Sequence, residues 1–121
     1  MLVERFKLLQ PYLTPRSVFL HVDAGDGALA IHVAGYVERV YAVGLSGRFP
    51  PGARLPVNLR FGWPPPGKVD VAFSERLHRT HGDEIRACLA SGGRYLVLAP
   101  PPRPGWLPRL LFRRRLVTAG P

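Results

Sequence analysis

The chain has 121 residues, enough for one hydrophobic core but not for two. Apolar residues make up 46% of the sequence but fall in short blocks, so no stretch approaches the roughly 20 apolar residues that span a bilayer. The first residues lack the apolar segment of a secretory signal, and we expect a soluble, cytoplasmic protein. The single cysteine, Cys88, excludes a framework of internal disulfides and has the surroundings of a small buried side chain.

The chain is strongly basic, and much of the charge lies near the C-terminus. Seventeen Lys and Arg against eight Asp and Glu give a formal net charge of +9, which favours polyanions or anionic surfaces as partners. Residues 100–121 contain five arginines and no acid, and are rich in proline. We therefore divide the chain into a domain over residues 1–99 and a basic tail over residues 100–121.

The first half predicts a strand, a glycine-rich turn, a helix and a second strand. Residues 17–22 are apolar and rich in β-branched and aromatic side chains, and they stop at Asp-Ala-Gly-Asp-Gly over residues 23–27, where glycine permits a tight turn. Residues 28–34 are good helix formers. Residues 39–43 form the next strand, which predicts two parallel strands joined by a right-handed crossover.

The second half continues the alternation. We expect strands over residues 55–61, 69–74 and 94–99, with a proline-rich loop after the first of them and a helix over residues 81–90 before the last. Alternating strands and helices predict a doubly wound, Rossmann-like α/β domain with a mainly parallel sheet of about five strands. Such a domain binds its ligand at the carboxyl ends of the strands, near the switch in strand order.

Four blocks of the sequence resemble class I S-adenosylmethionine-dependent methyltransferases of the small-molecule type. Residues 19–34 are similar to the first family motif, an acid followed by alternating glycines and a helix, and residues 39–43 and 69–74 continue the similarity. Residues 91–100, Ser-Gly-Gly-Arg-Tyr-Leu-Val-Leu-Ala-Pro, resemble the family's Pro-Gly-Gly-strand segment. The resemblance implies S-adenosylmethionine as cofactor and methyl transfer as activity, and the short length predicts a domain without the family's C-terminal antiparallel hairpin.

The resemblance also implies where the cofactor binds. Glycines let the backbone approach its methionine part, while acids beyond strands one and two hold its amino group and ribose hydroxyls. One alignment places Gly25 and Gly27 on family glycines and His21 at the acid, whereas a slipped one makes Asp23 the acid and puts Leu29 at the third glycine. The candidate cofactor-binding residues are Asp23, Ala24, Gly25, Asp26, Gly27, Gly44, Ser74 and Glu75.

Several family features are missing. The position of the ribose-binding acid at the end of strand two is Gly44, and the loop after the third strand carries no acid to contact adenine. The motif for methylating base or amide nitrogens is absent at residues 73–76, which disfavours nucleobase nitrogens as acceptors. Glu75, His78 and His81 have a three-residue spacing that could suit a metal or proton transfer, but solvated surface residues explain them better, and we predict no metal. No catalytic residue is assigned, because the cofactor carries the reactive group.

The basic tail carries aromatic and arginine side chains that suit a partner. A protein partner, a second copy of the chain covering the open sheet edge, or RNA could use them, and so could a strand or short helix lying on that edge with its arginines in solvent. The candidate partner-binding residues are Trp106, Arg109, Arg113, Arg114 and Arg115.

Two hypotheses about function follow. The first is a methyltransferase acting on an unidentified small molecule. The second is a non-catalytic scaffold with weak or lost cofactor binding, which serves as a binding or assembly module for protein or RNA through its tail.

Overall fold

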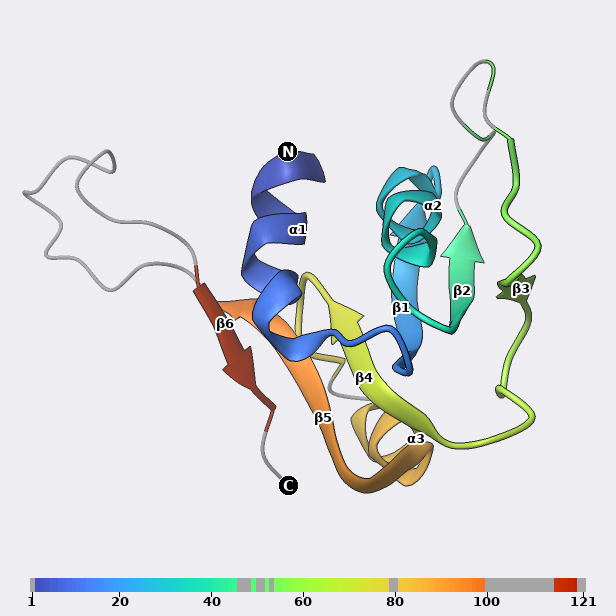
Figure 1. Ribbon diagram of the computed structural model, residues 1–121. Coiled ribbons are helices and arrows are strands. Elements are labelled where there is room, and N and C mark those ends of the chain that lie inside the picture. The colour runs from blue at the N-terminus through green and yellow to red at the C-terminus, as the bar shows by residue number, and fades with distance from the viewer. Residues whose placement is uncertain are drawn as a thin grey trace, which may run out of the picture.

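The architecture was derived from a computed structural model, which describes residues 2–45, 49, 52, 54–78, 81–99 and 115–119 (Figure 1). The described strands form one six-stranded sheet in the order β3-β2-β1-β4-β5-β6. The first five strands are parallel, and β6 pairs antiparallel with β5. The strands are β1 (Val18–Gly25), β2 (Arg39–Leu45), β3 (Leu59–Phe61), β4 (Val69–Ser74), β5 (Leu89–Ala99) and β6 (Arg115–Thr118).

The strand order confirms the predicted doubly wound class. The chain builds outward from β1 to β3 on one side and then returns to place β4 on the other side of β1. The strand order therefore reverses between β1 and β4. In this class the carboxyl ends of the strands at that reversal form the ligand-binding edge.

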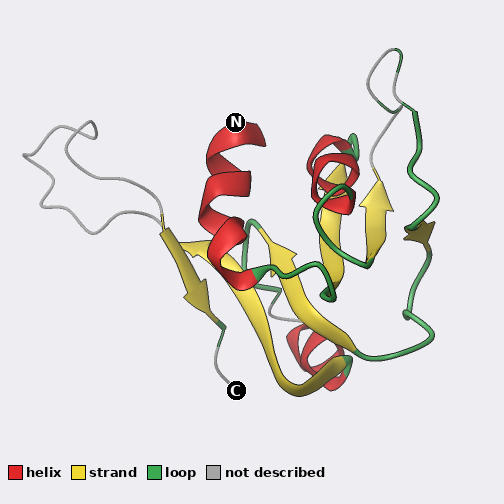
Figure 2. Cartoon of the chain, in the orientation of Figure 1, coloured by secondary structure: helices red, strands yellow, loops and turns green. Residues whose placement is uncertain are grey.

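Helices cover both faces of the sheet (Figure 2). On one face α1 (Leu2–Leu9) and α2 (Ala28–Ala34) pack on a core that includes Phe19 and Phe73, and on the other α3 (Gly82–Ala87) inserts Ile85 beside Tyr95. Neighbouring residues of β1 point to opposite faces, as the period of two in a strand requires. A 3₁₀ turn over Gln10–Tyr12 follows α1.

The sequence did not predict α1. Its buried side chains, Phe6 and Leu9, are three residues apart, so one face of the helix meets the core. The ring of Phe6 packs edge-on against His32, with 4.5 Å between centroids, and tilted against Tyr36 at 4.7 Å. These contacts fasten α1 to α2.

Several predicted boundaries are corrected by the structure. The first strand, β1, covers Val18–Gly25 rather than residues 17–22, and β2 ends at Leu45 rather than at residue 43, because both continue their parallel pairing past a bulge. The third strand covers Leu59–Phe61 rather than residues 55–61, because Leu55 and Val57 lie exposed outside the sheet. The helix before β5 ends at Ala87 rather than at residue 90. The strand β5 begins at Leu89 rather than at residue 94, because Leu89 already pairs with Val69 ahead of a break in register.

The segment predicted as a tail contributes β6 to the sheet. Leu116 packs against the core on the α1 face and Val117 against the core on the α3 face. The edge of β5 that we expected to be open is therefore paired over Leu96–Ala99. Association into a homodimer or with a protein stays a prediction.

The connection from β3 to β4 is a loop over residues 62–68 where such folds usually place a crossover helix (Figure 2). Its sequence explains the difference, because residues 64–66 are three consecutive prolines, which cannot sit inside a helix. The loop leaves Trp63 exposed, at 38%, beside the carboxyl ends of the strands.

Candidate functional site

The chain turns sharply from the last residues of β1 into the start of α2. Asp23, Gly25 and Gly27 all have left-handed backbone angles, with φ of 57°, 61° and 80°. Glycine adopts this conformation without strain and aspartate tolerates it better than most residues. Asp26 precedes the N-terminal cap of the following helix, and its Oδ1 accepts the backbone N–H of Ala28, the first residue of that helix, at 2.9 Å.

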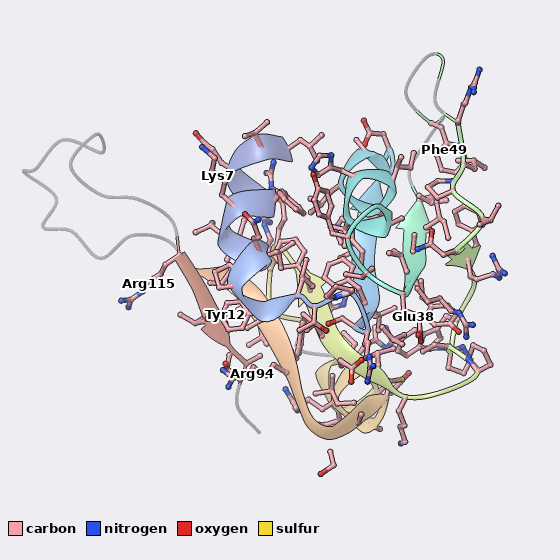
Figure 3. The ribbon with its side chains drawn as sticks, in the orientation of Figure 1. Lys7, Tyr12, Glu38, Phe49, Arg94 and Arg115 are labelled. Atoms are coloured by element: carbon pink, nitrogen blue, oxygen red, sulfur yellow. The ribbon has the colours of Figure 1, made fainter. Side chains whose placement is uncertain are left out.

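Gly25 faces open space in this turn. A Cβ added to Gly25 would have no protein atom within 4 Å among the described residues. At Gly27, by contrast, the added Cβ would lie 3.0 Å from the ring of Phe49. Phe49 in turn packs on Phe61 with 5.7 Å between ring centroids, so an aromatic pair lies beside the turn (Figure 3).

Asp23 bridges elements that are distant in the sequence. Its Oδ2 lies 2.5 Å from Nε2 of His78, which follows β4. Its Oδ1 lies next to Gly44 of β2, where an added Cβ would be 3.1 Å away. The carboxylate therefore stands between the end of β2 and the segment after β4, at the reversal of strand order.

Two cavities meet at Asp23. The first, which we call the loop cavity, has a volume of about 370 Å³ and lies between the glycine-rich turn, α1 and the segment after β4. The second, the apolar cavity, has a volume of about 380 Å³ and lies between β1, β2, the loop after β3 and α3. The loop cavity is lined by residues that include Arg5, His21, Asp23, Gly25, Asp26 and Glu75. The apolar cavity is lined by Val22, Asp23, Val43, Trp63, His78, His81, Glu84 and Ile85.

His21 is the buried polar residue of the loop cavity. Burial lowers the pKa of its imidazole to about 4, the charge of Asp23 opposes this shift, and Arg5 adds to it. The ring is 5% exposed and packs 5.4 Å from the ring of Phe73. Its Nδ1 has no hydrogen-bond partner among the described residues, which leaves a neutral, unsatisfied nitrogen beside the cavity.

Ser74 and Glu75, both predicted from the sequence, have different surroundings. Ser74 is fully buried, and its hydroxyl lies 2.6 Å from the backbone oxygen of Arg76 and 2.6 Å from the hydroxyl of Tyr95, so it stabilises the turn after β4. Glu75 lines the loop cavity and forms an ion pair with Arg5. This pair attaches α1 to the segment after β4 beside the cavity.

The other predicted site residues lie around the same turn. The structure places Ala24 in the wall of the loop cavity with Asp23, Gly25 and Asp26, while Gly27 is the N-terminal cap of α2.

Sequence reasoning assigned no cofactor role to several residues that line the two cavities or lie beside them: Arg5, Phe49, Trp63, His78 and His81. Phe61 and Trp63 had a usable signal, because Phe61 ends a predicted strand of a parallel sheet and Trp63 lies in the loop directly after it. Arg5 had none, because α1 itself was not predicted.

Of the predicted partner-binding residues, Trp106, Arg109, Arg113 and Arg114 lie outside the described residues. Arg115 begins β6, is exposed, and extends away from the sheet (Figure 3). In the parts of the chain that the structure describes, no group of three or more His, Cys, Asp or Glu side chains could hold a metal ion. None of the described helices is both long and apolar enough to cross a membrane.

A larger cavity, of about 500 Å³, lies at the opposite edge of the sheet. It is lined by Tyr12, Arg16, Asp70 and Arg94, with the guanidinium of Arg94 placed 5.6 Å from the ring centre of Tyr12 (Figure 3). Asp70 accepts the backbone N–H of Val18 at 2.8 Å. Because doubly wound domains bind ligands at the carboxyl edge, we place the candidate site at Asp23 rather than here.

Comparisons with known proteins identify the fold. No protein-family model and no curated protein sequence matches the chain. A S-adenosylmethionine-dependent methyltransferase from Thiobacillus denitrificans, solved with S-adenosyl-L-homocysteine, superposes with a TM-score of 0.60 at 18% identity. The match covers 81% of this chain and 47% of the methyltransferase. Precorrin-8w decarboxylase from Methanobacterium thermoautotrophicum superposes with a TM-score of 0.54 at 23% identity. The match covers 81% of this chain and 61% of the decarboxylase.

An rRNA methylase from Streptococcus thermophilus gives a TM-score of 0.53 at 16% identity, with 78% of this chain and 68% of that chain covered. The chain thus spans about half to two thirds of the length of these structures. The chain therefore has the same fold as these structures, which include a S-adenosylmethionine-dependent methyltransferase.

Proposed function

We propose that this chain binds S-adenosylmethionine at the carboxyl ends of β1 and β4 and serves the transfer of its methyl group to a small molecule. The observation that carries the proposal is the left-handed turn at Asp23–Gly27, whose residue Gly25 faces open space beside the loop cavity. A side chain at Gly25 would project into the room that a ligand needs to approach the backbone.

The residues present fit the cofactor in both chemistry and shape. Its amino-acid end carries an ammonium and a carboxylate, and the loop cavity offers Asp26 and Glu75 for the first and Arg5 for the second. The unsatisfied nitrogen of His21 is a further polar group that a ligand could satisfy. The apolar cavity, with Trp63 and Ile85 in its wall, suits a flat heteroaromatic ring.

When bound, S-adenosylmethionine supplies an electrophilic methyl group on a sulfonium. The work left to the protein is to hold the cofactor and acceptor in line and to exclude water. Here α1 covers the loop cavity, and its Arg5 is held by Glu75. The absence of the motif for base and amide nitrogens at residues 73–76 supports a small-molecule acceptor.

The first test is thermal unfolding with and without S-adenosylmethionine or S-adenosylhomocysteine. A ligand at about 100 times its dissociation constant stabilises the folded state by about 2.7 kcal/mol, which raises the melting temperature of a domain of this size by roughly 10 °C. We expect Gly25→Val to abolish this shift, because the side chain strains a left-handed residue and fills the space beside the cavity.

Gly92→Val is the matched control for that variant. Gly92 also has a left-handed backbone, with φ of 79°, and a Cβ there would also meet nothing within 4 Å, but Gly92 lies beside the cavity at the opposite edge of the sheet. The control should lose stability like Gly25→Val yet keep the ligand-induced shift. No shift of the wild type at about millimolar ligand would contradict the proposal and favour a non-catalytic scaffold.

A further inference from the structure

The strand β1 carries a bulge where it passes the end of β2. Val22 pairs with Val43, but the next pair is Gly25 with Leu45, so Asp23 and Ala24 together stand opposite the one residue Gly44. A bulge of this kind redirects a side chain out of the regular alternation of the strand. Asp23 is the redirected residue, and its φ of 57° belongs to the same distortion.

The space over the end of β2 holds one side chain only. A Cβ at Gly44 would lie 3.1 Å from Oδ1 and 3.2 Å from Cα of Asp23, closer than ordinary contacts allow. Gly44 also has a φ of 73°, which L side chains rarely adopt. An acidic side chain at position 44 of β2 and the carboxylate of Asp23 in its present position therefore cannot both be accommodated.

The carboxylate of Asp23 is held in place although its side chain is 65% exposed. His78, which is 23% exposed, contacts Oδ2 at 2.5 Å. No contact with another described side chain engages Oδ1, and a carboxylate oxygen can accept two hydrogen bonds. Asp23 thus presents a fixed acceptor at the point where the loop cavity and the apolar cavity meet.

We propose that Asp23 of β1 holds the two ribose hydroxyls of the cofactor, in the place that β2 leaves free with Gly44. This assignment rests on the proposed function. If the amino-acid end of the ligand lies in the loop cavity and its purine in the apolar cavity, the ribose between them lies next to Asp23, which lines both cavities. Asp26 and Glu75 remain in the loop cavity for the ammonium, so Asp23 is not needed there. His78 is a positioning residue for the carboxylate.

A binding cycle with two ligands and matched variants tests the assignment. Asp23→Asn keeps the shape of the side chain, and asparagine also tolerates a left-handed backbone, so the variant should fold. By titration calorimetry we expect it to bind S-adenosylhomocysteine about tenfold or more weakly than the wild type, since hydrogen bonds to a charged acceptor are lost. For the analogue that lacks both ribose hydroxyls, the wild type and Asp23→Asn should bind equally.

Two further variants complete the cycle. Asp26→Asn removes the same charge three residues away in the same cavity, and any weakening it causes should be equal for the two ligands. His78→Gln loosens the carboxylate of Asp23 and should weaken S-adenosylhomocysteine but not the analogue. This difference between ligands separates a positioning role from general damage to the fold.

The outcomes that contradict the assignment are distinct from those that contradict the proposed function. If Asp23→Asn weakens both ligands equally, or neither, the carboxylate does not hold the hydroxyls, and the assignment fails while cofactor binding stands. Equal binding of both ligands by the wild type would overturn it in the same way. If the wild type binds no S-adenosylhomocysteine at all, the proposed function fails and the assignment with it.

Discussion

His21 shows how one buried side chain links the site to the stability of the fold. The sequence placed it within β1, where an alternative alignment gave it the position of the family's acid. In the structure it lies among aromatic rings, 6.2 Å from Phe19 and 5.4 Å from Phe73, and burial favours its neutral form. Near neutral pH it is therefore a neutral imidazole, which can offer a ligand a ring nitrogen but not the negative charge of that acid.

The lowered pKa of His21 predicts an acid-sensitive fold. In the unfolded chain His21 takes up a proton below about pH 6.5, whereas in the folded chain it does so only near pH 4. The contribution of the neutral His21 to the unfolding free energy is therefore complete above about pH 6.5 and is lost as the pH falls toward 4. The difference corresponds to about 3 kcal/mol of unfolding free energy. Urea unfolding of the wild type between about pH 7.5 and about pH 4.5 should show this decline.

His21→Phe should reduce the decline, because phenylalanine suits the aromatic surroundings and takes up no proton. The exposed His32 provides a control, and His32→Phe should keep the pH dependence of the wild type. Parallel curves for His21→Phe and the wild type would mean that another group controls the acid response.

The glycine-rich turn was predictable residue by residue, but its contacts were not. Glycines after an apolar strand indicate a tight turn from sequence alone. The approach of Asp23 to His78 joins residues 55 positions apart, and the bulge that redirects Asp23 depends on its pairing with β2. No local pattern contains that information, so the sequence identified Gly44 as a missing acid and not as the space that Asp23 occupies.

Among the elements, those with a clear period and clear ends were predicted correctly. The strands β1 and β2 and the helix α2 combine apolar runs with glycine at or beside an end, and β4 is an apolar run that follows a proline-rich loop. The helix α1 has only 8 residues and is stabilised mainly by packing, so its local sequence does not distinguish it from a loop. The strand β6 has 4 residues in a stretch that mixes arginine with apolar groups, and its antiparallel pairing with β5 makes it a strand.

The contribution of β6 to the fold can be measured at two neighbouring positions. Leu116 is partly buried and packs against the core beneath α1, whereas Thr118 is exposed on the same strand. We expect Leu116→Lys to lower the unfolding free energy by about 2 kcal/mol, since apolar contact is lost and a charge is brought against the core. Denaturant unfolding of the purified protein gives the value.

Thr118→Lys adds the same charge at the exposed position and should change stability by no more than about 0.5 kcal/mol. Equal effects of the two substitutions would indicate that β6 does not pack on the core in solution. The edge of β5 would then be open to a partner, as the sequence alone suggested.

At the scale of the whole molecule, the site has the opposite charge character to the chain that carries it. The net charge is +9, yet Asp23, Asp26, Glu75 and Glu84, half of the eight acids, line the two cavities at the carboxyl edge. Composition alone pointed to polyanionic partners, because it averages over the surface. The structure shows that acids are concentrated at the candidate site although the chain as a whole is basic.

This separation predicts how salt affects the two forms of the cofactor. S-adenosylmethionine carries a sulfonium charge that S-adenosylhomocysteine lacks, so the acids at the site should attract the first more strongly. At an ionic strength of about 0.1 M the Debye length is about 10 Å, so distant arginines are already screened and the nearby acids dominate. Raising the ionic strength to about 1 M shortens it to about 3 Å and should weaken S-adenosylmethionine more than S-adenosylhomocysteine.

Calorimetric titrations of both ligands at the two salt concentrations measure this difference, with S-adenosylhomocysteine as the internal control for salt effects that do not depend on the sulfonium. If the overall charge of +9 governed the site instead, the cationic ligand would be repelled, and salt would strengthen its binding relative to the neutral one. The sign of the salt effect thus decides whether the local arrangement of acids around Asp23 or the charge of the whole chain determines which ligand the site prefers.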